Sequence, residues 1–283
     1  MIDSIFAAKL IGAVAERGGV GLVLSVAVAG IAWRSGSLSR SGMIAATACG
    51  TLCVAAGWSW GLLLILYFIA GSALSRAGSD TKDDRTRGIV AKGGARDALQ
   101  VVANGGVYSA LAIFAANSES QLLTWGAVAA LAAASSDTWA TEIGVGLGGV
   151  PRSIIRWTYV RTGESGGVTP AGLVGAAAGA AWIGLIALLT GFPRGVAIAA
   201  LFAGIGGSLL DSLLGATVQE RRRCDVCNEP TERVVHVCGS TTHRTGGIAG
   251  LNNDAVNLLS TVAGLLLGVL AFLLVQHWSA IGR

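Results

Sequence analysis

Long apolar runs separated by short polar segments dominate this chain of 283 residues. The hydrocarbon core of a bilayer is about 30 Å thick, so a helix that crosses it needs about 20 mainly apolar residues. Runs close to that length recur between residues 19 and 276, and the pattern predicts an all-α, polytopic membrane bundle of about eight transmembrane spans. The expected spans are 19–33, 42–55, 59–75, 98–116, 122–140, 168–190, 196–215 and 251–276.

One apolar block, residues 43–73, is too long for a single untilted span. Gly57 followed by Trp58 predicts a tight turn at the membrane interface that divides the block into two helices. One long tilted helix and a re-entrant pair are the alternatives. Residues 1–18 are expected to form a separate N-terminal segment without the features of a cleavable signal peptide, and residues 19–276 a single membrane domain.

The composition agrees with a chain that mostly avoids water. Hydrophobic residues make up 53% of the chain and charged residues only 13%, whereas an average soluble domain carries roughly 25% charged residues. A soluble globular protein is therefore excluded. The net charge of +4 does not indicate nucleic-acid binding, because the basic residues lie between the apolar runs, where Lys and Arg set the orientation of membrane helices.

The distribution of Lys and Arg between the loops predicts the orientation. With eight spans, sixteen of the 20 basic residues fall on one side, and the exceptions are Lys9, Arg17, Arg194 and Arg283. By the positive-inside rule, the basic loops are cytoplasmic and both termini lie outside. The long loops at 76–97, 141–167 and 216–250 share the cytoplasmic side, which favours a protein that acts at that face over a transporter.

Several acids and amides interrupt the predicted spans. A charged side chain at the centre of a span costs about 2.5–3.5 kcal/mol on insertion scales, so such residues are candidates for function. They come from four different helices, yet the predicted topology puts all of them in the cytoplasmic half, and we expect them to meet in one pocket. Capping of helix ends is the alternative, since Asp and Asn favour those positions. The residues are Asn104, Asp137, Glu142, Asp211, Asn253, Asp254 and Asn257.

Asp137 and Glu142 belong to one span but do not share a face. They are five residues apart, which corresponds to about 500° of rotation in a regular helix, so their directions differ by about 140°. A break in the helix near Thr141 or Gly144 would bring the two carboxylates together. The polar residues that open the last span, in contrast, include pairs three and four positions apart, which can share a face.

Carboxylates and carboxamides at one depth suit Mg²⁺, which proteins hold through one or two carboxylates together with substrate phosphates. Two glycine-rich loops on the same side, residues 92–96 and 163–170, add features of phosphate binding, because such turns present backbone N–H groups to anions. Neither loop matches the P-loop pattern, and ordinary turns are the alternative. Arg152 is a further candidate for a phosphate contact, with an orientation signal as its alternative.

The cytoplasmic loop at about 220–248 contains a cluster of cysteine and histidine residues. Two cysteines at Cys-x-x-Cys spacing, followed by a third cysteine and a nearby histidine, are typical of a structural zinc site. A cytoplasmic position argues against a disulfide, and unpaired thiols are the alternative. The expected ligands are Cys224, Cys227 and Cys238, with His243 or His236 as the fourth.

Six motifs follow one another along the chain: KGGARDALQVVANGG (92–106), SDTWATEIG (136–144), PR (151–152), SGGVTPAG (165–172), GSLLDSLLGA (207–216) and NNDAVN (252–257). The set resembles the membrane family that contains the plant phytyl-phosphate kinase and the vertebrate transmembrane protein 19, long labelled a domain of unknown function. The resemblance covers about residues 40–260. Family members commonly have Gly-Thr-Ser-Gly-Gly where this chain has Glu164 in second place, and we expect the added charge to alter donor or metal binding.

The resemblance implies a membrane prenyl-phosphate kinase, which transfers a phosphoryl group from a nucleoside triphosphate to an isoprenoid monophosphate. A distant similarity to phytol and dolichol kinases favours CTP as donor. A transporter or flippase for an ion or lipid phosphate, and a CTP-using cytidylyltransferase, are the alternatives. Prenyl chain length and oligomeric state stay open.

The acids and amides can be assigned to roles in such a reaction. We expect catalysis by Asp137, Asp211 and Asp254, with Mg²⁺ bound through these three and Glu142. The expected phosphate-binding residues are Lys92, Arg96, Asn104, Arg152, Ser165, Gly166, Gly167, Asn253 and Asn257.

Overall fold

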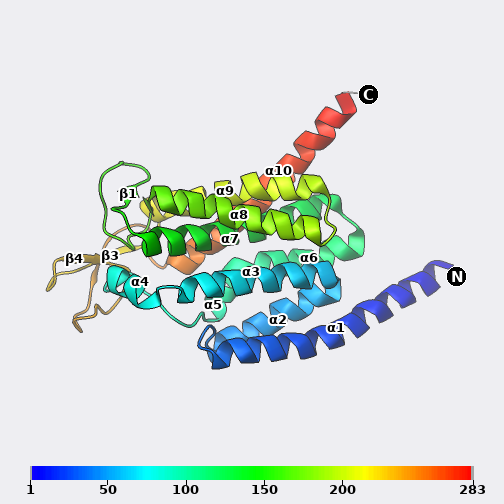
Figure 1. Cartoon of the computed structure of the whole chain (residues 1–283), viewed down its shortest axis with the longest axis horizontal. Coiled ribbons are helices and arrows are strands. Elements are labelled where there is room, and N and C mark those ends of the chain that lie inside the picture. The colour runs from blue at the N-terminus through cyan, green and yellow to red at the C-terminus, as the bar shows by residue number, and fades with distance from the viewer. Residues whose placement is uncertain (1, 282–283) are drawn as a thin grey trace.

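The computed structural model describes residues 2–281, which form an α-helical bundle (Figure 1). Long helices joined by short turns run back and forth between two ends of the molecule. The helices are α1 (Ile2–Arg34), α2 (Arg40–Ala56), α3 (Trp58–Arg76), α4 (Ser79–Thr86), α5 (Ala98–Val101), the π-helical turn η1 (Val102–Gly106), α6 (Val107–Ser118), α7 (Gln121–Leu147), α8 (Pro170–Leu189), α9 (Arg194–Thr217) and α10 (Asn253–Ile281).

The membrane architecture follows the hydropathy pattern. Within residues 2–281, six helical stretches are long and apolar enough to cross a bilayer: α1, α3, α5–α6, α8, α9 and α10. Helix α2, with 17 residues, is shorter, and α7, with 27 residues, contains a polar run around Asp137. The prediction of an all-α membrane bundle is confirmed, and six of the eight predicted spans meet both criteria of length and hydropathy.

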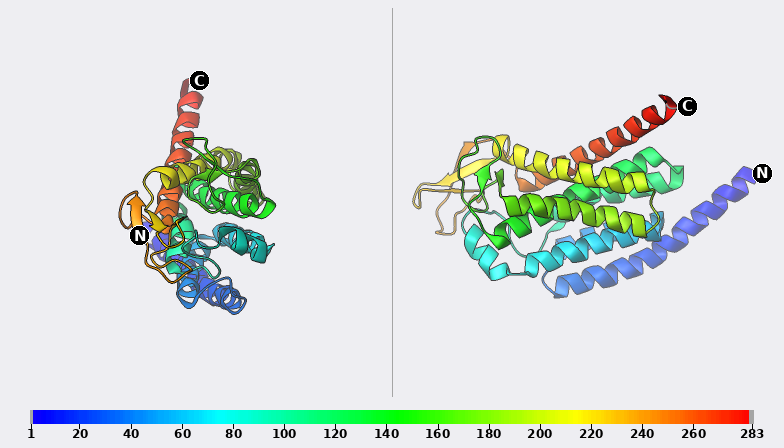
Figure 2. Two further views of the ribbon diagram at one scale, coloured as in Figure 1. Left: turned by 90° about the vertical axis from the view of Figure 1, so that its left-hand side faces the viewer. Right: turned by 45° about the horizontal axis from the view of Figure 1, so that its top comes forward.

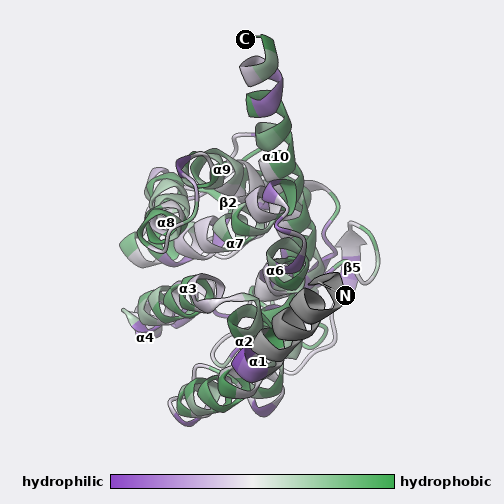
Figure 3. Cartoon of the chain, turned by 90° about the vertical axis from the view of Figure 1, so that its right-hand side faces the viewer, coloured by the Kyte–Doolittle hydropathy of each residue, from purple (hydrophilic) through white to green (hydrophobic). Residues whose placement is uncertain are grey.

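Apolar residues predominate along the long helices (Figure 3), and many of them are exposed. Val23 of α1, Ile69 of α3, Phe202 of α9 and Leu266 of α10 are each more than half exposed. Apolar surface of this extent is typical of a protein that contacts another apolar phase. The hydrocarbon core of the bilayer is this apolar phase. The polar groups are concentrated in other parts of the molecule.

Gly57 separates α2 from α3 at the predicted turn. Its φ of 152° and ψ of 159° lie in a region that essentially only glycine adopts. The block at 43–73 is therefore two helices and not one long tilted helix. The first helix, in contrast, is continuous from Ile2 to Arg34, so it runs through the boundary expected at residue 18.

Helix α7 is the centre of the bundle. It packs against α6, α8, α9 and α10, and every residue from 127 to 136 is buried. Small residues permit this arrangement because they let helix backbones approach closely. At Gly179 of α8, an added Cβ would lie 2.6 Å from the carbonyl oxygen of Ser135. The hydroxyls of Ser135 and Ser136 donate hydrogen bonds to the carbonyls of Gly179 and Ala176, each at 2.9 Å, so the polar groups inside this interface are satisfied.

The long loops gather at one end of the bundle, and the helix ends that carry the two termini lie at the other (Figures 1 and 2). The loops contain short strands that the sequence pattern did not predict. Strand β1 (Arg152–Ser153) pairs antiparallel with β2 (Gly167–Val168). Residues 221–246, here called the Cys/His module, form a three-stranded antiparallel sheet in the order β4-β3-β5. Its strands are β3 (Arg221–Cys224), β4 (Glu229–Thr231) and β5 (His243–Gly246).

Candidate functional site

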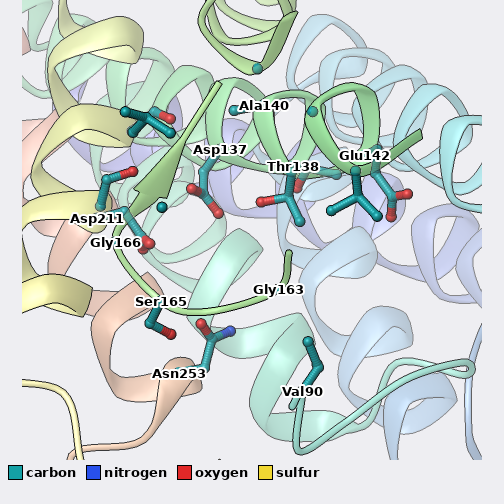
Figure 4. A pocket seen from close by; sticks show the side chains of 18 of the residues that line it. Val90, Asp137, Thr138, Ala140, Glu142, Gly163, Ser165, Gly166, Asp211 and Asn253 are labelled. Atoms are coloured by element: carbon teal, nitrogen blue, oxygen red, sulfur yellow. The ribbon is translucent and has the colours of Figure 1, made fainter. Parts of the chain in front are cut away.

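A polar cavity of about 320 Å³ lies at the loop end of the bundle (Figure 4). Its walls come from the α5–η1 stretch, α7, α9 and the start of α10, and the loop before β2 crosses it. Acids and amides from four helices thus face one space. The predicted site residues that line it are Lys92, Arg96, Asn104, Asp137, Glu142, Ser165, Gly166, Gly167, Asp211, Asn253 and Asn257.

Asp137 of α7 and Asp211 of α9 face this cavity from adjacent helices (Figure 4). Both lie inside their helices, so neither is a helix cap. Among the described residues, neither carboxylate forms an ion pair with a Lys, Arg or His. Asn257 of α10, with its amide nitrogen turned toward Asp211, donates a hydrogen bond to Oδ2 at 3.0 Å. Two carboxylates without a cationic partner in an enclosed site are costly, and a divalent cation would neutralise both.

Glu142 lines the same cavity but does not turn toward Asp137. Helix α7 stays regular to Leu147, so no break near Thr141 or Gly144 brings the two carboxylates together. The Oε2 atom of Glu142 pairs with Lys82 of α4 at 2.8 Å, and its Oε1 accepts a hydrogen bond from Ser75 at 2.5 Å. Both oxygens of Glu142 therefore have protein partners, and a magnesium ion shared by Glu142 and Asp137 stays a prediction.

Two carboxylates hold Lys92 at the cavity. Its Nζ lies 2.5 Å from Asp254 and 2.7 Å from Asp97. Partial burial works to lower the pKa of Lys92, but the hydrogen bonds and the charges of these two aspartates outweigh it, so the pKa is raised and the ammonium group stays charged. Asp254 itself is buried and does not line the cavity. The structure thus pairs Asp254 with Lys92 and does not bring it into the cavity lining with Asp137 and Asp211, and its role as a catalytic metal ligand stays a prediction.

Arg96 and Asn104 form the side of the cavity nearest α3. The guanidinium of Arg96 donates to the hydroxyls of Ser72 at 3.1 Å and Ser75 at 3.2 Å. Asn104 lies in the π-helical turn η1, a local form that is frequent at functional sites, and its Nδ2 donates to the carbonyl of Gln100 at 2.9 Å. The helix is thus interrupted at the amide that the sequence analysis singled out.

The glycine-rich loop, residues 163–167, crosses the cavity before β2 (Figure 4). Gly163 and Gly166 have φ angles of 90° and 81°, which glycine adopts without strain. Gly166 also packs against α9 so closely that an added Cβ would overlap Ala216. Close packing therefore fixes the position of the loop, and Ser165 and Gly167 border the cavity as predicted.

Glu232 is a cavity residue that the sequence analysis did not single out. It belongs to the Cys/His module, and its Oε1 accepts hydrogen bonds from Ser165 and from Gln219 Nε2, the latter at 2.7 Å. Burial raises the pKa of Glu232, against the opposite effect of hydrogen bonds from Ser165, Ala91 and Gln219. No pattern marks this residue, because it is one acid in a loop whose fold depends on contacts distant in sequence.

Arg152 does not line the cavity. Its guanidinium carbon lies 4.5 Å from the ring centre of Tyr159 and 5.7 Å from that of Trp157, and its Nη2 donates to the Tyr159 hydroxyl at 2.9 Å. These contacts stabilise the loop between β1 and β2 through cation–π attraction. The structure therefore does not bring Arg152 to the polar cavity, and its contact with phosphate stays a prediction.

An apolar cavity of about 380 Å³ adjoins the polar one. Helices α1, α2 and α3 line it with side chains such as Leu24 and Phe68, and Leu24 is 45% exposed on the outside of α1. Arg96, Gln100 and Asn104 border both cavities. A polar chamber and an apolar chamber thus share one wall.

The three cysteines of the predicted zinc site come together with one histidine. The donor atoms that lie within 4.8 Å of one another belong to Cys224, Cys227, His236 and Cys238. His243 is elsewhere, on β5, where its Nδ1 lies 3.1 Å from the Asp225 carboxylate. Of the two histidines that the spacing left open, His236 therefore joins the cysteines, and the assignment of His243 is corrected.

Comparisons with known proteins agree with the membrane architecture. The family described as integral membrane protein DUF92 matches residues 23–265, a segment that includes every residue lining the polar cavity. Protein PGR of Arabidopsis thaliana is 33% identical over 265 residues, which cover 84% of this chain and 90% of that protein. An uncharacterized membrane protein of Methanocaldococcus jannaschii is 29% identical over 246 residues, which cover 84% of this chain and 87% of that protein. No solved structure matches. The chain belongs to the DUF92 family of integral membrane proteins.

Proposed function

We propose that this protein is a membrane prenyl-phosphate kinase, which transfers a phosphoryl group from a nucleoside triphosphate to an isoprenoid monophosphate. The observation that carries the proposal is the shared wall of the two cavities, formed by Arg96, Gln100 and Asn104. A ligand that fits both chambers has an anionic head and an apolar tail. The polar chamber contains the cations that an anionic head requires, and the apolar chamber lies among membrane helices.

The acceptor phosphate is proposed to bind at the wall between the chambers. Arg96 borders both cavities, and Lys92 lies in the same polar chamber. A guanidinium and an ammonium group suit phosphate oxygens, the first through paired hydrogen bonds and the second as a point charge. The isoprenoid tail then extends between α1, α2 and α3, so the acceptor does not have to leave the bilayer.

The remaining part of the polar chamber suits Mg²⁺. Asp137 and Asp211 offer carboxylate oxygens without cationic partners among the described residues, and Asn253 and Ser208 add amide and hydroxyl oxygens to the lining. Oxygen donors of this kind are the ones that Mg²⁺ prefers. When bound, Mg²⁺ neutralises charge on the phosphates and stabilises the transition state of phosphoryl transfer.

In the proposed reaction, an oxygen of the acceptor monophosphate attacks the γ-phosphorus of the nucleoside triphosphate. The bond between the γ-phosphorus and the bridging oxygen breaks, and the nucleoside diphosphate leaves with that electron pair. The acceptor becomes a diphosphate, so atoms and charge balance. Because a phosphate monoester is largely ionised at neutral pH, the step needs orientation by Lys92 and Arg96 more than it needs a strong base.

The glycine-rich loop is the proposed contact for the donor phosphates. Ser165, Gly166 and Gly167 border the chamber, and the loop is fixed against α9. The family resemblance favours CTP as donor. Glu164, which also lines the chamber, adds a negative charge beside this contact and is expected to weaken triphosphate binding unless Mg²⁺ compensates for it.

A donor-by-acceptor screen tests this function. Purified protein in detergent is combined with farnesyl, geranylgeranyl or phytyl monophosphate and with each of the four nucleoside triphosphates, with and without Mg²⁺, and the products are identified by mass. A prenyl diphosphate and a nucleoside diphosphate are the expected products. Release of pyrophosphate with a nucleotide-linked lipid would identify a cytidylyltransferase instead. Nucleotide-independent flux of an ion or a lipid phosphate in liposomes, without any transfer, would identify a transporter or flippase.

A further inference from the structure

The Cys/His module lacks an apolar core of its own. Its larger apolar side chains are all more than half exposed, and they are Val226, Val234, Val235 and Val237. A segment of this size cannot bury enough apolar surface for a unique fold, so it usually needs a disulfide or a metal ion. The three antiparallel strands of the module therefore require an additional source of stability.

The side chains inside the module have the spacing of a metal site. Cys224 Sγ lies 3.6 Å from Cys238 Sγ, and His236 Nδ1 lies 3.3 Å from the same sulfur. In a tetrahedral site with zinc–sulfur distances of about 2.3 Å, two sulfur ligands are about 3.8 Å apart. A disulfide would instead join two sulfurs at about 2.05 Å. The donor spacing therefore favours a shared metal ion over a disulfide.

We propose that Cys224, Cys227, His236 and Cys238 bind one Zn²⁺, and that the zinc-bound module holds Glu232 in the polar cavity, where it connects two loops. Four protein ligands complete the coordination of a structural zinc ion, so none is left for a reacting water. Glu232 lies between the second cysteine and the histidine, inside the segment that zinc binding would close. This inference does not depend on the reaction catalysed.

The backbone of the module rests on the segment that leads to Lys92. The Thr231 hydroxyl donates to the carbonyl of Gly88 at 2.6 Å, and the Glu232 amide donates to the carbonyl of Ile89 at 2.8 Å. The proposed ligand His236 packs on Gly88, where an added Cβ would lie 3.0 Å from its Nε2. The zinc ligand and the segment before Lys92 are thus in direct contact.

The side chain of Glu232 connects this segment to the glycine-rich loop. Its Oε2 accepts a hydrogen bond from the Ala91 amide at 3.4 Å, and its Oε1 accepts from the Ser165 hydroxyl. The residue before Lys92 and the loop that crosses the cavity therefore share one carboxylate. Glu232 is a positioning residue in this arrangement, and loss of zinc is expected to loosen both loops at a distance.

Metal content tests the site directly. Full-length protein purified without chelators is expected to carry one zinc ion per chain, and Co²⁺ in its place is expected to show thiolate-to-cobalt charge-transfer absorption with tetrahedral d–d bands. Cys238→Ser and His236→Ala should lose these signals, whereas the matched control His243→Ala should keep both. Retention of zinc in His236→Ala, loss of zinc in His243→Ala, or a disulfide between two of these cysteines in wild type purified without chelators would overturn the assignment.

Hydrogen exchange tests the connection to the cavity without an activity assay. Removal of zinc from the wild-type protein with a chelator is expected to speed amide exchange about tenfold or more at residues 88–92 and 163–167, and added Zn²⁺ should restore the slow rate. Glu232→Gln should keep its zinc and yet show faster exchange in the same two segments. Unchanged exchange at both segments after zinc removal, or in Glu232→Gln, would contradict the positioning role even if the zinc site itself is correct.

Discussion

Among single residues, the two carboxylates without cationic partners offer the most direct test of the site. Asp137→Asn and Asp211→Asn keep the size of the side chain but remove its charge, so we expect Mg²⁺-dependent transfer to fall about 100-fold or more. The thermal unfolding midpoint in metal-free buffer should rise, because an enclosed charge without a partner is destabilising. Glu142→Gln is the control: it breaks the ion pair with Lys82, so its midpoint should fall instead. Wild-type rates of transfer in both Asn variants would show that these aspartates take no part in the reaction.

Asp97 pairs with the cavity residue Lys92 and is expected to make the stability of the protein depend on pH. Its Oδ1 caps α5 by accepting from the Gln100 amide at 3.0 Å, and its Oδ2 pairs with Lys92. Partial burial works to raise its pKa, but the hydrogen bonds from Lys92 and Gln100 prevail and lower the pKa below the ordinary value of 3.8. The carboxylate therefore contributes stability that is present above pH 3.8 and is lost as the pH falls through the lowered value.

Asp97→Ala is thus expected to destabilise the protein by about 1 kcal/mol at neutral pH, the typical loss for a removed helix cap. The difference from wild type, followed by chemical or thermal unfolding in detergent, should shrink once the pH drops below 3.8. Asp97→Asn retains a side chain that can cap α5. It should therefore lose only the part of the stabilisation that depends on the negative charge of Asp97. A difference between wild type and Asp97→Ala that is independent of pH would show that the ion pair with Lys92 is unimportant.

Among the elements, the interface of α7 with α8 depends on the absence of a side chain at Gly179. Gly179→Ala places a Cβ 2.6 Å from the Ser135 carbonyl oxygen, so we expect a loss of about 1–3 kcal/mol from overpacking. Gly30→Ala in α1 is the matched control, because nothing lies within 4 Å of its added Cβ and alanine favours helix. The thermal unfolding midpoint should fall below the wild-type value in Gly179→Ala and rise above it in Gly30→Ala. Equal midpoints would mean that α7 and α8 can move apart without loss of stability.

The helices and loops also show which features of the structure can be predicted from sequence patterns. Long apolar runs and the turn at Gly57 could be located because helix length and glycine conformation are local properties, and the acids of α7 and α9 stood out against apolar neighbours. The partners of Glu142 could not be predicted, because Lys82 and Ser75 are 60 and 67 positions away in the chain. Glu232 was missed for the same reason, since its partner Ser165 is 67 positions away in the chain.

For the molecule as a whole, the structure puts the long loops at one end and both chain ends at the other (Figure 1). The distribution of basic residues predicts that the loop end is cytoplasmic. An epitope inserted beside the exposed Asp83 of α4 should be reached by antibody only after cells are permeabilised. An epitope beside the exposed Asn117, in the last turn of α6, should be reached in intact cells. Exposure of the first site in intact cells would reverse the orientation and move the proposed active face outside.

Under the proposed function, the apolar chamber beside α1 has a consequence for enzyme kinetics. An acceptor that enters through Leu24 and Leu62, both almost half exposed, is supplied by lateral diffusion within the lipid and not from the surrounding solution. Turnover in mixed micelles should then follow the mole fraction of acceptor in the micelle, so extra detergent at constant total acceptor slows the reaction by surface dilution. Bulky replacements at Ala46, which borders the same chamber, should narrow the range of chain lengths accepted while leaving shorter homologues as substrates.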